Sequence, residues 1–201
     1  MSSHPALQPY LDELVERIGA VVALDAAYLV GSGAYGGFEA GRSDVDLVAV
    51  VPRRLTDDEK QAIVAAAESV PGPGRKLELV VYARGHDEYE LNLNTGEFVS
   101  FDPANDPPFW FVLDRAIAEQ HAVPLLGARW AEVFEPVAPH TIIDALRQSL
   151  DWHAREQPLD ANAVLDACRA WTWVEDGEWA SKPEAAAWLR GKVRAALEQA
   201  C

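Results

Sequence analysis

Between Tyr28 and Val51 the sequence reads YLVGSGAYGGFEAGRSDVDLVAVV. A short apolar run ends at the first glycine, a glycine-rich segment follows, and residues with β-branched side chains then resume. This pattern predicts a strand, a loop over residues 31–43 with at most one helical turn, and a second strand over residues 45–51. We interpret the rest of the chain around these two strands and the small-residue loop between them.

Asp44 and Asp46 begin the second predicted strand two residues apart, so both side chains leave the same face of the sheet. Adjacent carboxylates repel, and Mg²⁺ relieves the repulsion because it takes hard oxygen ligands and shares them with substrate phosphates. Gly31 and Ser32 follow the first strand, where small residues let amides and a hydroxyl approach phosphate closely. Alone, either feature is common on exposed strand ends and turns. Together and in this order they indicate nucleotidyl transfer.

Helical spacing and strand alternation describe the rest of the chain. Helices are predicted over residues 7–24, 56–69, 109–121, 141–153, 161–175 and 181–199, and strands over residues 76–82 and 89–94. Capping boxes are expected where Thr56 precedes Glu59 and where Ser181 precedes Glu184. Residues 95–108 are predicted to be an extended loop, and everything from Phe109 onward to be helical. The pattern predicts an α/β half followed by an all-helical half.

Composition limits the classes of partner. The 201 residues include 32 acidic and 17 basic side chains, a net charge of −15, which argues against a protein that binds nucleic acid or anionic membrane lipids. An acidic surface suits a cationic small molecule, and it equally suits ordinary solubility. We expect a cytoplasmic protein, because the N-terminus lacks the pattern of a signal peptide and no apolar run could span a bilayer. We also expect a monomer or a weak dimer.

Three segments of the quoted stretch resemble a known signature: Gly31-Ser32, Gly36-Gly37 and Ser43-Asp44-Val45-Asp46-Leu47. They resemble the DNA-polymerase-beta-like nucleotidyltransferase superfamily and, more narrowly, the aminoglycoside adenylyltransferases that modify streptomycin and spectinomycin. Further similar segments are residues 77–82, 89–92, 168–171, 181–182 and 184–188. The resemblance implies an α+β fold with a nucleotidyltransferase domain over residues 1–106, made of a mixed sheet with flanking helices. A C-terminal helical bundle would follow over residues 107–201.

The same resemblance implies roles for residues of the first half. Asp44, Asp46 and Glu78 would ligate magnesium, and Glu78 would also be the general base that takes the proton from the acceptor hydroxyl. Gly31 and Ser32 would hold the nucleotide phosphates. A physical argument agrees for Glu78, because a carboxylate on a strand face is costly unless a cation lies nearby. The alternative interpretation of Glu78 is a solubilising charge on an edge strand.

In the helical half, Arg169 and Lys182 would reach towards the triphosphate of ATP. Lys182 lies in the first turn of its predicted helix, where the helix dipole disfavours a cation and a phosphate would favour it. Simple solvent exposure is the alternative for Lys182. For Arg169 the alternative is an ion pair with Asp166 within one helix.

An acceptor site is expected from Trp152, Glu156 and Asp160, whose ring and carboxylates suit a cationic sugar. Trp152 could equally belong to the helical core. The predicted activity is magnesium-dependent transfer of AMP from ATP to a hydroxyl of a small cationic acceptor of the aminoglycoside type, and hence antibiotic resistance. The alternatives are transfer to another metabolite or protein, or a regulatory or antitoxin module with the same fold.

Overall fold

A computed structural model gives the structure, which describes residues 7–157 and 160–200. The chain divides into two compact units. The first comprises the residues up to Pro108 together with His121–Pro136, and the second comprises Phe109–Gln120 together with the residues from Val137 onward. The predicted boundary between two domains at residues 106 and 107 stays a prediction.

The first unit is built on a six-stranded sheet with the strand order β5-β4-β3-β2-β1-β6. Its strands are β1 Ala26–Val30, β2 Val45–Val51, β3 Leu77–Ala83, β4 Tyr89–Asn94, β5 Phe98–Ser100 and β6 Val123–Gly127. Its helices are α1 Gln8–Gly19, α2 Gly31–Ala34 and α3 Asp57–Glu68, with short 3₁₀ turns at Pro103–Asn105 and Trp130–Glu132. Strands β2 and β3 are parallel and the other pairings are antiparallel, which confirms the predicted mixed sheet.

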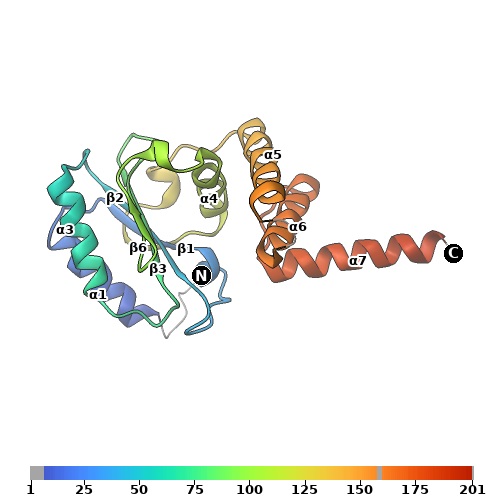
Figure 1. Ribbon diagram of the computed structural model, residues 1–201, viewed down its shortest axis with the longest axis horizontal. Helices are drawn as coiled ribbons and strands as arrows, with labels where there is room; N and C mark the ends of the chain where they lie inside the picture. Colours follow the sequence, from blue (N-terminus) through green and yellow to red (C-terminus); the bar gives the residue numbers. More distant parts are fainter. Residues whose placement is uncertain (1–6, 158–159, 201) are drawn as a thin grey trace. The chain divides into compact units, whose positions relative to one another are not determined.

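A row of leucines crosses four strands and forms the centre of the hydrophobic core. The four are paired in register and almost fully buried: Leu29, Leu47, Leu79 and Leu93. Helices α1 and α3 lie side by side over this face of the sheet (Figure 1). The predicted capping box begins α3, since Thr56 Oγ1 accepts from the amide of Glu59 and the Glu59 carboxylate accepts from the amide of Thr56. Burial of each leucine stabilises the unit by about 2 kcal/mol.

The pairing of β3 with β4 contains a bulge. Val81 pairs with Leu91 and the next residue, Tyr82, pairs with Tyr89, so Glu90 is the extra residue on β4. A bulge turns neighbouring side chains away from strict alternation. Glu90 therefore points towards α3 although it lies between two residues of a buried strand.

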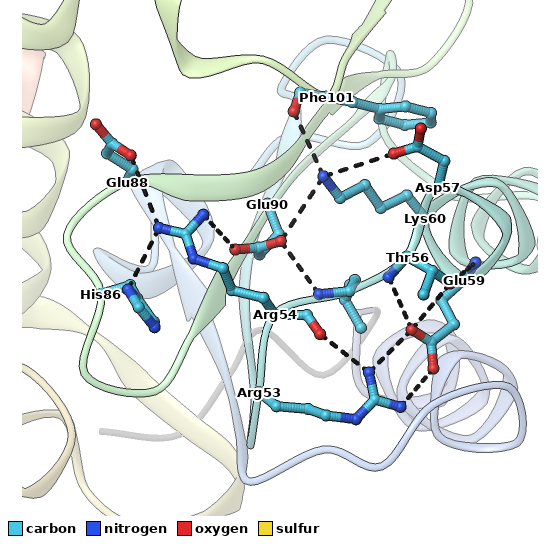
Figure 2. A network of polar contacts seen from close by, with 11 residues as sticks. Arg53, Arg54, Thr56, Asp57, Glu59, Lys60, His86, Glu88, Glu90 and Phe101 are labelled. Carbon is cyan, nitrogen blue, oxygen red and sulfur yellow. Dashed lines mark hydrogen bonds and ion pairs between the residues drawn. The ribbon is translucent and has the colours of Figure 1, made fainter.

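Glu90 is the centre of a buried ionic network (Figure 2). Its side chain is 2% exposed and forms ion pairs with Arg54 (3.2 Å) and Lys60 (3.7 Å), and it accepts a hydrogen bond from the amide of Leu55 (3.2 Å). Lys60 also donates to the carbonyl oxygen of Phe101 (3.5 Å). These contacts join α3 and the β2–α3 loop to β4, and they compensate the cost of burying the carboxylate.

Two strands contradict the sequence-based predictions. β5 lies in the segment predicted to be a loop, and β6 lies in the region predicted to be entirely helical. The prediction was wrong for β6 because this strand depends on pairing with β1, about a hundred residues earlier, which local periodicity does not encode. Helix α1 ends at Gly19 and does not extend to Leu24.

The second unit is helical, as predicted. Its helices are α4 Pro108–His121, α5 Pro139–Glu156, α6 Ala161–Asp176 and α7 Lys182–Ala200. The expected capping box begins α7, where the hydroxyl of Ser181 accepts from the amide of Glu184 and the Glu184 carboxylate accepts from the amide of Ser181. Within the described part of the chain, the helices are too short or too polar to cross a membrane.

Candidate active site

The residues next in sequence to the core leucines point to the opposite face of the sheet and form a row that is largely polar. Asp46 pairs with Val30 on one side and with Glu78 on the other, so the two carboxylates are neighbours on adjacent strands. Neighbouring strands are about 4.8 Å apart. Asp44 lies two residues before Asp46, just ahead of β2, and on the same face. The structure therefore places the three carboxylates that the sequence singled out at neighbouring positions on one face of the sheet.

The glycine-serine turn lies against this row. Gly31 has a φ of +57°, and a Cβ atom at this position would collide with the carboxylate of Asp46. Glycine is required both for the left-handed backbone and for the close approach. Ser32 follows in the single turn of α2, which is the one helical turn predicted for the loop. Gly31 and Asp46 are thus in direct contact, and Ser32 is adjacent to them.

Two basic side chains already neutralise part of this acidic row. Arg75 Nε donates to Asp44 Oδ1 (2.9 Å) and Arg75 Nη2 donates to Asp44 Oδ2 (2.7 Å). Lys76 Nζ lies 2.9 Å from Glu78 Oε1 and 2.6 Å from Glu97 Oε2. Burial alone would lower the pKa of Lys76, but its hydrogen bonds to the two glutamates outweigh burial and raise the pKa. Sequence reasoning had assigned no role to Arg75 or Lys76.

The far half of the same sheet face is closed by aromatic rings. Trp130 packs edge-on against Tyr28 (5.0 Å between centroids), and Phe134 packs edge-on against Tyr82 (5.4 Å). Tyr28 and Tyr82 are buried, whereas the side chain of Glu78 is 36% exposed. On this face Glu78 is therefore partly accessible to solvent, whereas the two tyrosines are not.

Two asparagines extend the polar row onto β4, and sequence reasoning missed them. Asn94 pairs with Glu78, and Asn92, two residues earlier on the same face, donates to Asp106 Oδ2 (3.2 Å). Tyr89 donates a hydrogen bond to the same carboxylate. Both asparagines are buried. The signal was present in the sequence, because Asn-Leu-Asn alternation in a buried strand places two amides on one face.

In the second unit, Arg169 and Lys182 meet at one carboxylate. Asp166 lies 3.7 Å from Arg169 Nη1 and 3.2 Å from Lys182 Nζ. Arg169 Nε also donates to the carbonyl oxygen of Ala180 (3.1 Å), and its guanidinium lies 5.9 Å from the ring centroid of Trp179. Asp166 therefore supplies the negative partner that the dipole argument requires for Lys182. The two cations are brought together, and their role towards a nucleotide stays a prediction.

The predicted acceptor residues lie around the end of α5 and the start of α6. Trp152 belongs to an aromatic cluster, with its ring 5.2 Å from that of Trp110 and 5.0 Å from that of His153. Glu156 lies one turn further along α5 and is exposed. Asp160 is the N-cap of α6, where one carboxylate oxygen accepts from two backbone amides. The structure thus gives Trp152 a packing role and Asp160 a capping role, and it leaves their binding roles as predictions.

Comparison with known proteins extends over both units. Residues 132–200 match the family model described as the C-terminal domain of aminoglycoside adenylyltransferase. The aminoglycoside (3'')(9) adenylyltransferases of Klebsiella pneumoniae and Escherichia coli are each 28% identical over 216 residues, which cover 91% of this chain and 79% of the relative. The Rhizobium radiobacter enzyme of the same name is 29% identical over 170 residues, or 73% of this chain and 62% of the relative.

The chain is therefore similar to aminoglycoside adenylyltransferases over most of its length. A solved structure, the spectinomycin adenyltransferase AAD(9) from Enterococcus faecialis with ATP and spectinomycin, superposes with a TM-score of 0.67 at 16% identity. The superposition covers 88% of this chain and 78% of the other. At this identity the likeness concerns the fold, and it agrees with a mixed sheet followed by a helical region.

The donor chemistry of this adenylyltransferase-like chain fits a magnesium ion. Asp44, Asp46 and Glu78 offer only carboxylate oxygens, which are the hard ligands that Mg²⁺ prefers. In residues 7–157 and 160–200, however, no three such side chains are gathered closely enough to hold an ion as they lie. The ion pairs to Arg75 and Lys76 give the physical reason, since each base holds one carboxylate. A metal must therefore compete with two internal cations.

Proposed function

We propose that the protein transfers AMP from ATP to a hydroxyl group of an aminoglycoside-type acceptor in a magnesium-dependent reaction. One observation carries the proposal: Asp46 and Glu78 are paired in register beside Asp44, and the turn at Gly31 lies directly against Asp46. The similarity to named adenylyltransferases over 91% of the chain supports the reaction class. The net charge of −15 suits a polycationic acceptor.

In the proposed reaction the acceptor oxygen attacks the α-phosphorus of ATP, a new P–O bond forms, and the bond to the bridging oxygen of the β-phosphate breaks to release pyrophosphate. Glu78 takes the proton of the acceptor hydroxyl. Bound Mg²⁺, held by Asp44, Asp46 and Glu78, would neutralise charge on the triphosphate. Ser32 and the backbone at Gly31 would orient the phosphates. Catalysis would depend on positioning and electrostatics and would need no covalent enzyme intermediate.

The second unit would contribute nucleotide and acceptor contacts. Arg169 and Lys182 place two positive charges beside the carboxylate of Asp166, and both would contact the nucleotide phosphates. Trp152 would offer an apolar ring and Glu156 an exposed carboxylate to a cationic sugar. Asp160 has one carboxylate oxygen engaged in its helix cap, and the other would pair with an ammonium group.

The direct test is a panel assay. Purified protein is incubated with MgATP and with streptomycin, spectinomycin or other amino sugars, and both pyrophosphate release and the mass of the product are measured. We expect a product heavier by one AMP unit with at least one of the aminoglycosides. If MgATP binds but no aminoglycoside causes pyrophosphate release, the acceptor would instead be another metabolite or a protein.

Glu78→Gln tests the general base, and Glu97→Gln is its matched control. Both glutamates contact Lys76, and both variants remove one negative charge beside that lysine. We expect Glu78→Gln to bind MgATP in calorimetry but to lose AMP transfer by about a hundredfold or more, since a positioned base contributes on that scale. Glu97→Gln should stay within a few-fold of wild type. If Glu78→Gln instead lost nucleotide binding, Glu78 would act chiefly as a ligand.

A further inference from the structure

We propose that Arg75 exchanges partners during the reaction cycle: it holds Asp44 in the ligand-free protein and binds the polyphosphate of the nucleotide once a metal ion takes Asp44. The proposal rests on the proposed function, because it assumes that MgATP binds at the carboxylate row. It assigns a nucleotide contact to a residue that neither the sequence patterns nor the reaction scheme above had included.

The position of Arg75 is built into the backbone. Its amide donates to the carbonyl oxygen of Ser43 (2.9 Å), and the amide of Val45 donates to the carbonyl oxygen of Lys76 (2.9 Å). These two bonds continue the parallel pairing of β2 and β3 beyond the strand ends. Gly74 permits this approach, because a Cβ atom there would lie 2.9 Å from the Ser43 carbonyl oxygen. Arg75 is therefore held opposite Asp44 whether or not its side chain forms the ion pair.

The side chains are suited to an exchange. Arg75 meets Asp44 through two parallel N–H···O bonds, the geometry in which a guanidinium also binds phosphate. Its side chain is 61% exposed, whereas that of Asp44 is 20% exposed. A divalent ion bound to Asp44 would repel the nearby Arg75 guanidinium and would weaken the carboxylate oxygens as acceptors, so the two cations compete for Asp44. When an ion takes the carboxylate, the freed guanidinium remains at the site, where the triphosphate is the strongest available anion.

The exchange predicts opposite changes in two affinities. In Arg75→Ala the internal competitor for Asp44 is gone, so the affinity for metal alone should rise by about threefold to tenfold. The affinity for ATP in the presence of saturating Mg²⁺ should fall by about tenfold, because a charge-assisted bidentate contact is lost. Arg75→Lys keeps the positive charge but loses the two parallel N–H donors of the guanidinium. Both of its affinities should lie between those of wild type and Arg75→Ala.

Arg42→Ala is the matched control. Arg42 lies two residues before Asp44, is highly exposed and pairs with Glu39 (2.9 Å), so its removal changes the net charge near the site by the same amount. It should leave both affinities within about twofold of wild type, because an exposed pair is worth little. If Arg42→Ala changed the two affinities as much as Arg75→Ala does, the effect would come from the net charge near the site and not from the contact of Arg75 with Asp44.

The experiment uses the full chain without acceptor. Metal affinity is measured with Mn²⁺ by electron paramagnetic resonance, with Mg²⁺ as competitor, and ATP affinity is measured by calorimetry at saturating Mg²⁺. A higher metal affinity together with a lower ATP affinity in Arg75→Ala supports the exchange. Any other combination, including a fall in both, overturns it while the proposed function stands. If wild type binds no MgATP, the proposed function fails, and this inference fails with it.

Discussion

At the scale of single residues, the site depends on a glycine, Gly31, because a side chain at this position would not fit. Gly31 adopts a left-handed conformation, and its missing Cβ is the space that the Asp46 carboxylate occupies. The glycine joins the end of β1 to the single turn of α2, so it fixes where the backbone before Ser32 runs relative to the carboxylates. A residue with a side chain at this position would disturb both the turn and the acid.

Gly31→Ala should therefore be far more damaging than Gly36→Ala. Both glycines have positive φ, +57° and +76°, but a Cβ at Gly36 meets nothing within 4 Å. We expect Gly36→Ala to cost about 1 kcal/mol from the backbone conformation alone. Gly31→Ala should cost at least about 2 kcal/mol more, because it adds a steric collision, and it should weaken Mn²⁺ binding. Urea unfolding and metal titration of the two variants check this. Equal costs would mean that the carboxylate moves aside freely.

Single residues also mark the limit of prediction from sequence. Alternation placed Asp44, Asp46 and Glu78 on one face, and the structure agrees. The partner Arg75 could not be predicted, because it meets Asp44 across 31 positions through the pairing of two distant segments. Strand periodicity reports which face a residue occupies, and it does not report which charge opposes it.

At the scale of elements, the unit β2–α3–β3 was the most predictable part of the fold. A capping box, a run of β-branched residues and a Pro-Gly segment each mark one of its boundaries, and all of these signals are local. β5 and β6 were not predictable, since both are short strands at the edges of the sheet and each depends on pairing with its one neighbouring strand. The bulge at Glu90 belongs to the same class, because it is a property of the pairing of β3 with β4 and not of β4 alone.

Glu90→Gln tests how far the bulge depends on its buried charge. The variant keeps an acceptor for the Leu55 amide but leaves Arg54 and Lys60 with only their longer ion pairs to Glu88 (3.9 Å) and Asp57 (4.0 Å) (Figure 2). We expect a loss of about 3 kcal/mol in the free energy of unfolding, as for other broken buried ion pairs. The double variant Glu90→Gln with Lys60→Met should recover part of that loss, because it removes the buried cation that has lost its buried carboxylate partner. Denaturant unfolding measures both. No recovery would assign the cost to Arg54 or to packing.

At the scale of the whole molecule, the net negative charge and the burial of tyrosines both oppose the formation of further negative charge at high pH. The chain carries a net charge of −15 at pH 7, so every further ionisation adds to an existing repulsion. Tyr10 and Tyr28 are buried in the first unit, and burial is the largest cause that raises the pKa of each to about 12. Either tyrosine can ionise only by placing a negative charge in the core of an acidic protein.

Alkaline unfolding should therefore be steep and should depend on these two tyrosines. The pKa of each is higher in the folded than in the unfolded state, so the stabilisation is complete below pH 10 and is lost as the pH rises towards 12. Each group contributes about 2–3 kcal/mol at most over this range. Tyr10→Phe and Tyr28→Phe should each make the fall in unfolding free energy with pH shallower. Tyr28→Phe should also be less stable at pH 7, because Tyr28 donates to the carbonyl oxygen of Ala128 (2.8 Å).

Salt distinguishes burial from general repulsion in this experiment. Repulsion among surface charges is screened at about 0.5 M salt, whereas the cost of ionising a buried phenol is screened much less. We expect the slope of unfolding free energy against pH between 10 and 12 to persist at high salt in wild type, and to be reduced in the two Phe variants at either salt concentration. Tyr35→Phe, at a partly exposed position, is the control and should keep the slope of wild type. A wild-type slope that disappears at high salt would assign alkaline unfolding to the net charge alone.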